Sequence, residues 1–263
     1  MTPDELLGPT LGGEVAWQAS DNPIPDSDMA RVFAGQSQTH KVAHYIPIYE
    51  DIFGAYRDRP IQMLEIGVDR GGSLQLWRKY FRPESVIVGI DCLQQCKRFD
   101  DPANNVHVRI GYQEDAGFLQ TVVTEFGGFD IILDDGSHYP SHVLASFGYL
   151  FPNGLVDHGV YLVEDLFCSY VPDMEPGHPP FMDTVKALID VMHAHYPMVS
   201  SGPGPDIAYA FEVNKLDLSG PNLKRRQQLQ VPLATVLISS IQVHDSIVAI
   251  FRGPRELPRI LRK

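Results

Sequence analysis

Residues 129–138 read Phe-Asp-Ile-Ile-Leu-Asp-Asp-Gly-Ser-His, and residues 160–165 read Val-Tyr-Leu-Val-Glu-Asp. Each stretch is an apolar run that ends abruptly in two acids, Asp-Asp in the first and Glu-Asp in the second. An apolar run of this length, bounded by turn signals, is typical of a buried parallel strand. Because open α/β sheets bind ligands at the carboxyl ends of their strands, we expect both acidic ends to line one crevice.

Around these two runs, strand-like and helix-like segments alternate. The predicted strands are 61–66, 85–90, 106–110, 129–133, 160–163 and 207–213, followed by β-rich runs at 235–244 and 246–252 that form a closing hairpin. The predicted helices are 42–57, 73–80 with Ser73 as N-cap, 118–126, 140–150 and 181–196. Alternating strands and helices imply βαβ units, so the predicted class is α/β with a Rossmann-like, mostly parallel sheet and a terminal antiparallel hairpin.

The bulk composition bounds the class of protein. The chain has 263 residues, 44% of them hydrophobic, which suits one α/β domain with an extension. Its formal net charge of −12 argues against nucleic acid or an anionic membrane as the main partner, and we interpret the acidic excess as a source of solubility. The three cysteines give no disulfide framework, and neither a signal peptide nor a membrane-length apolar run is visible. These features favour a cytoplasmic protein.

The N-terminal part differs in composition from the rest. Residues 1–30 are rich in Gly, Pro, Asp and Ser, and we interpret them as a loose arm or an oligomer contact rather than as core. Residues 42–57 carry apolar groups at helical spacing, with Pro47 near the helix start, and could cover the ligand edge of the sheet as a lid. We therefore divide the chain into an arm with lid helices, 1–58, and an α/β domain, 59–263.

The turn after the first predicted strand reads Glu65-Ile66-Gly67-Val68-Asp69-Arg70-Gly71-Gly72. Its glycines let the backbone turn tightly and let a ligand approach, although an ordinary βα turn would also use them. The spacing is not the dinucleotide fingerprint G-x-G-x-x-G, and the acid at Glu65 would repel a pyrophosphate. It suits a cationic ligand such as the amino group and sulfonium of S-adenosylmethionine. The turn therefore argues against the alternative of an NAD(P)-dependent oxidoreductase.

The next two strand ends add polar groups to the same edge. Asp91 ends the second strand, 24 residues after Gly67, where an acid can accept hydrogen bonds from both ribose hydroxyls of a nucleoside. This contact serves NAD as well as S-adenosylmethionine, and a helix-capping Asp91 is the alternative. The third strand leads to Gly111-Tyr112-Gln113, where an adenine ring could be held.

The acidic strand ends predict a metal centre. Adjacent carboxylates repel one another unless a cation neutralises them, and a hard cation such as Mg²⁺ prefers oxygen ligands. Asp135, Glu164 and Asp165 are the predicted ligands, with two substrate hydroxyls completing the coordination. Asp134 is expected instead to cap the following turn or hold a backbone amide, and two polar residues that merely begin a loop are the alternative for Glu164 and Asp165.

A base stands beside these acids. His138 follows Asp135 by three residues and is suited to take a proton from a metal-bound hydroxyl near neutral pH. The resulting alkoxide would attack a methyl group in line with the sulfonium, without a covalent enzyme intermediate. His142, one helical turn further, is expected to be a partly exposed helix residue.

Together these motifs resemble the metal-dependent sugar O-methyltransferases of class I, a family that includes the macrolide deoxysugar methyltransferases of mycinamicin and demethylmacrocin. The resemblance spans about residues 37–168. It rests on His44-Tyr45-Ile46-Pro47-x-Tyr49-Glu50, Leu64-Glu65-Ile66-Gly67-Val68, Gly71-Gly72-Ser73-Leu74-x-x-Trp77, Gly89-Ile90-Asp91, Asp134-Asp135-Gly136-Ser137-His138 and Tyr161-x-x-Glu164-Asp165. Among these, the Asp-Asp-Gly-Ser-His run is specific by itself.

The resemblance implies a fold, two cofactors and a set of site residues. It implies the class I methyltransferase fold with a mostly parallel seven-stranded sheet, S-adenosylmethionine and Mg²⁺ as cofactors, and a homo-oligomer. His138 would be the base. The implied metal ligands are Asp135, Glu164 and Asp165, and the implied cofactor residues are Thr39, Glu65, Gly67, Ser73, Asp91 and Gln113.

The chain departs from the family pattern in ways that bear on the acceptor. The family often has Thr-Asp-Lys where this chain has Thr39-His40-Lys41, and often an acid at Tyr112. The macrolide enzymes carry a further N-terminal domain, so we expect a small glycoside, an oligosaccharide or a polysaccharide end, as in the similar methyltransferases of mycobacterial methylmannose polysaccharides. A catechol or other phenolic acceptor and a non-catalytic binding protein on the same fold are the alternatives.

Overall fold

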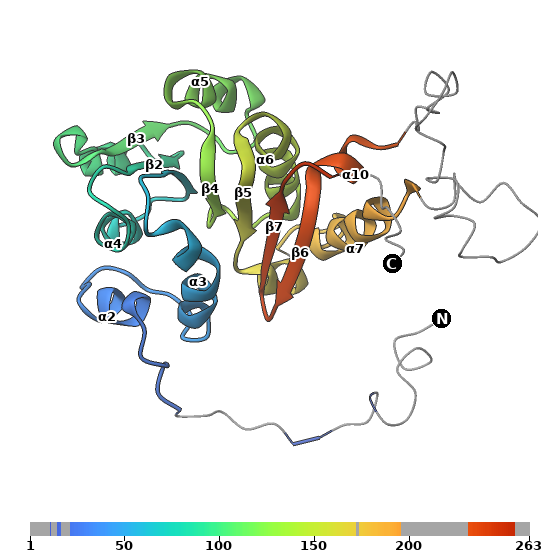
Figure 1. Cartoon of the computed structure of the whole chain (residues 1–263), viewed down its shortest axis with the longest axis horizontal. Helices are drawn as coiled ribbons and strands as arrows, with labels where there is room; N and C mark the ends of the chain where they lie inside the picture. The colour runs from blue at the N-terminus through green and yellow to red at the C-terminus, as the bar shows by residue number, and fades with distance from the viewer. Residues whose placement is uncertain (1–10, 12–14, 17–21, 172–173, 196–230, 256–263) are drawn as a thin grey trace, which may run out of the picture.

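The computed structural model describes residues 11, 15–16, 22–171, 174–195 and 231–255, and within them seven strands form a single sheet (Figure 1). The strand order is β3-β2-β1-β4-β5-β7-β6. The five parallel strands are β1 (Gln62–Ile66), β2 (Val86–Asp91), β3 (Val106–Ile110), β4 (Phe129–Asp134) and β5 (Leu155–Val163). β7 (Ile247–Arg252) runs antiparallel between β5 and β6 (Ile238–His244). The predicted α/β class and the closing antiparallel hairpin are confirmed.

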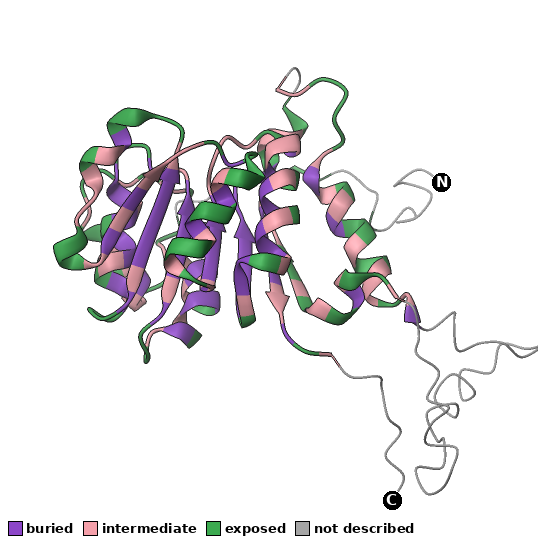
Figure 2. Ribbon diagram, turned by 90° about the horizontal axis from the view of Figure 1, so that it is seen from above, coloured by how far each residue is buried: buried purple, intermediate pink, exposed green. Residues whose placement is uncertain are grey.

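Helices cover both faces of this sheet, so that its strands are largely buried (Figure 2). One face packs against α2 (Asp28–Ala34), α3 (Tyr45–Phe53) and α4 (Gly72–Tyr80), and the other against α5 (Ala116–Phe126), α6 (Pro140–Asn153), α7 (Phe181–Met192) and α10 (Leu233–Leu237). Short 3₁₀ helices are η1 (Gly54–Tyr56), η2 (Gln94–Phe99), η3 (Pro102–Asn104) and η4 (Leu166–Tyr170).

The two faces carry separate apolar cores because successive side chains of a strand point to opposite sides. In β4, Ile131 and Leu133 belong to the core beneath α3 and α4, whereas Ile132 belongs to the core beneath α5 and α6. All three side chains are fully buried. A strand that is buried on both faces needs apolar residues at every position, which is why this run of sequence lacks alternation.

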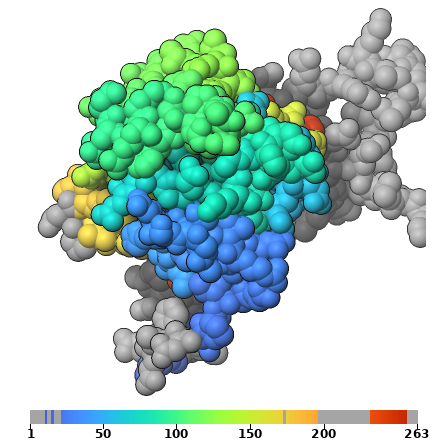
Figure 3. Space-filling view, turned by 90° about the vertical axis from the view of Figure 1, so that its left-hand side faces the viewer, coloured from blue at the N-terminus to red at the C-terminus, as the bar shows by residue number. Residues whose placement is uncertain are grey.

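The N-terminal residues contribute to the core more than their composition predicted. The interpretation of 1–30 as loose arm is wrong at its end, because Met29 of α2 is fully buried. Ser27 caps α2, and the Met29 amide donates to Glu50 of α3 at 2.7 Å. Figure 3 shows these N-terminal residues (blue) seated against those around α4 (teal), which α2 contacts.

Several predicted boundaries shift. The predicted helix over 42–57 is α3 followed by η1, and Pro47 is the third residue of α3. Ser73 is not the N-cap of α4, because Gly71 takes that position in a left-handed conformation at φ 72°. α5 begins two residues early at Ala116, α6 extends to Asn153, and α7 ends at Met192.

The part of the chain from β5 onward differs most from the sequence prediction. β5 begins at Leu155 rather than Val160, and a register shift separates its two parts. The β-rich run at 235–244 is strand only from Ile238, because α10 occupies Leu233–Leu237. The predicted strand 207–213 lies outside the described residues. Among the helices that the structure describes, none is both long and apolar enough to cross a membrane.

Candidate active site

A cavity of about 1080 Å³ opens at the carboxyl ends of the central parallel strands. One wall comes from the turns after β1 and β2 and includes Gly67 and Asp91. The opposite wall comes from the ends of β4 and β5 and includes His138. Residues 38–42, between α2 and α3, close a third side. The predicted cofactor-binding turns and the predicted metal site therefore line one cavity.

Gly67 allows the turn after β1 to approach the end of β4 closely. Its φ is +94°, a conformation that side chains rarely adopt, and a Cβ there would lie 2.0 Å from the carbonyl oxygen of Asp135. The Asp135 amide in turn donates to the Ile66 carbonyl at 2.9 Å. Only glycine allows the β1 turn to approach the β4 end this closely, so the residue predicted for cofactor binding also sets the width of the site.

Asp91 lines the cavity and organises the glycine turn. Its Oδ2 accepts hydrogen bonds from the amides of Val68 at 2.9 Å and Asp69 at 3.1 Å, and its Oδ1 accepts from the Leu93 amide at 2.8 Å. The carboxylate is held rigidly by three backbone donors. Its remaining lone pairs are the part of the group that a ligand in the cavity can reach.

Glu65 lies behind the cavity wall rather than in it. It is fully buried and accepts hydrogen bonds from the Ser73 hydroxyl at 2.8 Å and from the Trp77 indole at 2.9 Å. Burial raises the pKa of Glu65 to about 7, although the nearby charge of Lys41 opposes the shift. Glu65 is absent from the residues that line the cavity, whereas Ser73 lines it.

Gln113 and Thr39 also line the cavity, as the resemblance implied. The Gln113 side chain accepts from the Ser137 amide at 2.8 Å and donates to Asp134 at 3.2 Å, so it ties the β3 end to the loop that carries the acids. The Thr39 hydroxyl is buried and has no hydrogen-bond partner. A buried hydroxyl without a partner is costly, and a ligand in the cavity would satisfy it.

Asp134 supports the site from beneath. It is buried and accepts from the Ser146 hydroxyl at 2.6 Å and the Tyr161 hydroxyl at 2.8 Å, besides Gln113. Burial raises the pKa of Asp134, against the lowering effect of these donors. The expected supporting role holds, but its partners are side chains from α6, β5 and the β3 end instead of the predicted backbone amide.

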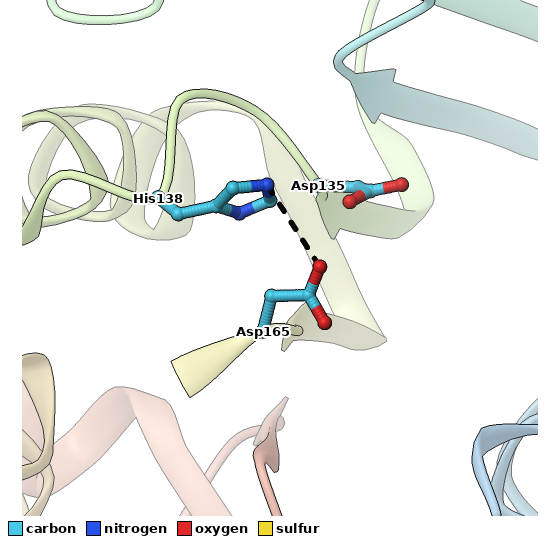
Figure 4. Close-up of side chains that lie close together, drawn as sticks. All are labelled: Asp135, His138 and Asp165. Atoms are coloured by element: carbon cyan, nitrogen blue, oxygen red, sulfur yellow. Dashed lines mark ion pairs between the residues drawn. The ribbon is translucent and has the colours of Figure 1, made fainter. Parts of the chain in front are cut away.

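Asp135, His138 and Asp165 come together in the cavity (Figure 4). Each offers one ligand atom, and these atoms lie within 4.8 Å of one another. The His138 Nε2 is 3.8 Å from the Asp165 Oδ2. His138 and Asp165 both have left-handed backbone conformations, at φ 61° and 57°, and such strain persists only where the surroundings hold it.

Two distant segments hold Asp165 in place. The Tyr45 hydroxyl of α3 donates to Asp165 at 2.7 Å. On the other side, the amide of Leu166, the residue after Asp165, donates to the Ser246 carbonyl at 3.1 Å. Ser246 lies in the turn between β6 and β7. The orientation of Asp165 therefore depends on residues from both ends of the chain.

Glu164 is engaged by side chains that the sequence analysis did not consider for the site. It is buried, and it accepts one bond from the Lys41 ammonium and another, at its other oxygen, from the Tyr49 hydroxyl of α3. Lys41 also bonds to Asp135. Burial and the charge of Asp135 raise the pKa of Glu164. Burial also acts to raise the pKa of Asp135, but the charge of Lys41, the hydrogen bonds with Glu164 and Lys41 and the charge of His138 together outweigh it and lower that pKa.

A signal for the two tyrosines was present in the sequence, because Tyr45 and Tyr49 are four residues apart on one helix face within a recognised motif. No local pattern marks Lys41 as a partner of acids that lie 94 and 123 residues away. His142 also lines the cavity, and its Nδ1 lies 2.9 Å from the Ser137 hydroxyl.

The donor set fits a hard divalent cation. Ligand atoms of Asp135, His138 and Asp165 lie together in one space. Glu164 lines the same cavity but is not part of this group, and each of its oxygens accepts a hydrogen bond. The buried, unpartnered hydroxyl of Thr39 and the rigid Asp91 carboxylate likewise fit a polar nucleoside on the opposite wall.

Comparison with known proteins places this chain among sugar-modifying relatives. It is 39% identical over 135 residues to the 8-demethyl-8-(2-methoxy-alpha-L-rhamnosyl)-tetracenomycin-C 3'-O-methyltransferase of Streptomyces olivaceus, which covers 49% of this chain and 33% of the relative. It is 33% identical over 177 residues to the demethylmacrocin O-methyltransferase of Streptomyces fradiae, covering 62% of this chain and 44% of the relative. The chain spans less than half the length of either relative. No protein-family model matches the chain.

The fold is also shared with a solved structure. A structure of the MycE methyltransferase from the mycinamycin biosynthetic pathway, in complex with Mg, SAH and mycinamycin VI, superposes with a TM-score of 0.68 at 24% identity, covering 90% of this chain and 56% of that one. The comparisons confirm the resemblance to sugar O-methyltransferases and the class I methyltransferase fold that the sequence predicted.

Proposed function

We propose that this chain transfers a methyl group from S-adenosylmethionine to a sugar hydroxyl, with Mg²⁺ as a second cofactor. One observation carries the proposal: a single cavity joins the Gly67 and Asp91 turns to the cluster of Asp135, His138 and Asp165. A nucleoside wall and a carboxylate–histidine wall within one cavity are what a metal-assisted methyl transfer requires, because donor and acceptor must meet there.

The cofactor wall would bind S-adenosylmethionine through groups that are already oriented. Asp91 would accept hydrogen bonds from the ribose hydroxyls, and Gly67 leaves room for the ligand beside the backbone. Thr39, Ser73 and Gln113 would supply polar contacts. Glu65 would act through Ser73, whose hydroxyl it fixes.

On the acidic wall, Asp135, Glu164 and Asp165 would hold Mg²⁺. Bound Mg²⁺ would orient a sugar diol and lower the pKa of one hydroxyl. His138 would accept the proton of that hydroxyl at a ring nitrogen, with the Asp165 carboxylate 3.8 Å from its Nε2. Tyr45 and Tyr49 of α3 orient the carboxylates and help to exclude water from them.

The acceptor class follows from the relatives, whose names describe methylation of rhamnosyl and other sugar units. We propose a sugar hydroxyl on a small glycoside, an oligosaccharide or a polysaccharide end such as a methylmannoside. We further propose that residues 1–58 form an arm and lid over a methyltransferase domain at 59–263, that the protein is a homo-oligomer, and that it acts in the cytoplasm without nucleic acid as a partner.

The test is an acceptor panel. The protein is incubated with labelled S-adenosylmethionine, Mg²⁺ and rhamnosides, mannosides, deoxysugar glycosides and catechols, and the methylated position is mapped by NMR. We expect methyl transfer to a sugar hydroxyl that EDTA abolishes and Mg²⁺ restores. Transfer to catechols alone, NAD(P) turnover, or full activity without metal would contradict the proposal.

A further inference from the structure

We propose that Lys41 is a tethered counter-cation of the metal site, so that its ammonium and a divalent cation compete for Asp135 and Glu164. This inference rests on the proposed function, in which those carboxylates serve a metal. In this proposal Lys41 regulates the entry of the metal ion. The chain segment that carries Lys41 links metal entry to the cofactor wall.

The contacts of Lys41 support direct competition. Its ammonium bonds to one oxygen of Asp135 and one oxygen of Glu164, and its side chain is only 4% exposed. The other oxygen of Glu164 accepts from Tyr49. Each oxygen of Glu164 therefore accepts one hydrogen bond, and a metal ion that approaches this carboxylate meets the positive charge of the ammonium at the same group. A lysine ammonium donates three hydrogen bonds and accepts none, so it seeks the same lone pairs as a hard cation.

Charge explains why the lysine is present. Asp135, Glu164 and Glu65 lie together in the interior, and Lys41 is the cation that pairs with Asp135 and Glu164 among the ion pairs of the described residues. Buried carboxylates without a counter-charge are strongly destabilising. Lys41 thus stabilises the metal-free protein, and a divalent ion that takes its place brings the larger compensating charge.

The segment that carries Lys41 also touches the cofactor wall. A Cβ on Gly72, the first residue of α4, would lie 2.5 Å from the backbone of Gln38 and 2.7 Å from the Thr39 amide. The backbone of Gln38 and Thr39 therefore rests directly on the glycine turn, and Thr39 lines the cavity beside it. Because only His40 separates Thr39 from Lys41, displacement of the ammonium is expected to loosen this wall.

The first measurement is metal affinity without turnover. Mn²⁺ serves as the probe, and its binding to the cofactor-free protein is followed by electron paramagnetic resonance for the wild type, Lys41→Gln and Lys41→Arg. If the ammonium occupies the site about nine-tenths of the time, its removal should tighten Mn²⁺ binding about 10-fold in Lys41→Gln. Lys41→Arg retains the charge and should bind like the wild type or more weakly. Lys186→Gln, which removes a lysine from an exposed pair with Asp183, is the matched control and should leave Mn²⁺ binding unchanged.

The second measurement uses the wild type and does not depend on a variant that folds. Hydrogen exchange of residues 36–44 is compared with and without saturating Mn²⁺, and we expect faster exchange when the metal is bound. Unchanged exchange, or equal or weaker Mn²⁺ binding by folded Lys41→Gln, would overturn the competition while leaving the metal site intact. If neither the wild type nor Lys41→Gln binds Mn²⁺, the metal role in the proposed function fails and this inference fails with it.

Discussion

The two walls of the cavity are built in different ways. On the cofactor side, the polar contacts span fewer than 25 residues of the chain. Asp91 of the wall is held by the amides of Val68 and Asp69, and Glu65 behind the wall is held by Ser73 and Trp77. On the acidic wall, Glu164 and Asp165 are held by Lys41, Tyr45 and Tyr49, more than 100 residues away. The contacts that hold Asp91 and Glu65 stay between β1 and the loop after β2, whereas those that hold Glu164 and Asp165 exist only when the N-terminal segment is folded onto the sheet.

The buried acids of the two walls show the same contrast. Glu65 and Glu164 are both shielded from water. The direct partners of Glu65 are neutral donors of its own βα unit, whereas Glu164 depends on an ammonium and lies beside a second carboxylate. A wall of charged, long-range contacts is more sensitive to the loss of one partner than a wall of neutral, local ones.

Removal of the base should have the largest effect. His138→Ala is expected to lower kcat by about 10²–10⁴-fold, because it removes the imidazole that lies beside Asp135 and Asp165, while the affinity for S-adenosylmethionine stays near the wild-type value. Steady-state kinetics and calorimetric titration of the cofactor measure the two quantities. His142→Ala, in the same cavity, is the matched control and should lose much less activity. Substantial transfer by His138→Ala would remove the residue from the mechanism.

On the cofactor wall, Asp91→Ala should weaken S-adenosylmethionine binding by about 10–100-fold, since it removes a charged hydrogen-bond acceptor from the ligand. The protein should also lose about 1–3 kcal/mol of stability, because three backbone amides lose their partner. Asp115→Ala is a matched control: Asp115 accepts the amides of Gly117 and Phe118 but does not line the cavity. It should lose stability without losing cofactor affinity. Equal cofactor binding by Asp91→Ala and the wild type would show that the carboxylate serves the turn alone.

The tyrosines of α3 test how the acidic wall depends on its surroundings. Tyr49→Phe should lower the free energy of unfolding by about 1–3 kcal/mol, because it leaves a buried oxygen of Glu164 without a donor. Tyr45→Phe should cost less, about 0.5–1.5 kcal/mol, since water can replace the hydroxyl at the partly exposed Asp165. Urea denaturation in EDTA compares the two variants. A larger loss for Tyr45→Phe would reverse this ranking of the two carboxylates.

The last prediction concerns the pH dependence of stability that Glu65 contributes. Its pKa of about 7 in the folded protein lies above the value of about 4.3 in an unfolded chain, so the folded state binds the extra proton between these values. The contribution of Glu65 to stability is therefore present at low pH and is lost as the pH rises toward 7. Glu65→Gln should flatten this decline by no more than about 1.4 kcal/mol per pH unit. Parallel pH profiles of unfolding for the two proteins would contradict the assignment.

Much of the strand and helix pattern was predictable because it depends on residues that are neighbours in the chain. The apolar runs that become β4 and β5 and the acids that end them follow from residue period and turn chemistry, which act over a few positions. The same reasoning placed Asp135, His138 and Asp165 at one edge, where the structure brings them together. The predicted N-cap at Ser73 was wrong, because Gly71 is the N-cap of α4. The Ser73 hydroxyl donates a hydrogen bond to Glu65 instead.

The sequence by itself determined the alternation of strands and helices from β1 to β5, the acidic strand ends and the family resemblance, because each depends on local patterns. Only the tertiary structure decided that Met29 is core, that Glu65 is sealed behind the cavity wall, and that Lys41 pairs with Asp135 and Glu164. These outcomes depend on which distant surfaces pack together, and a pairing across more than 90 residues leaves no periodic trace in the chain.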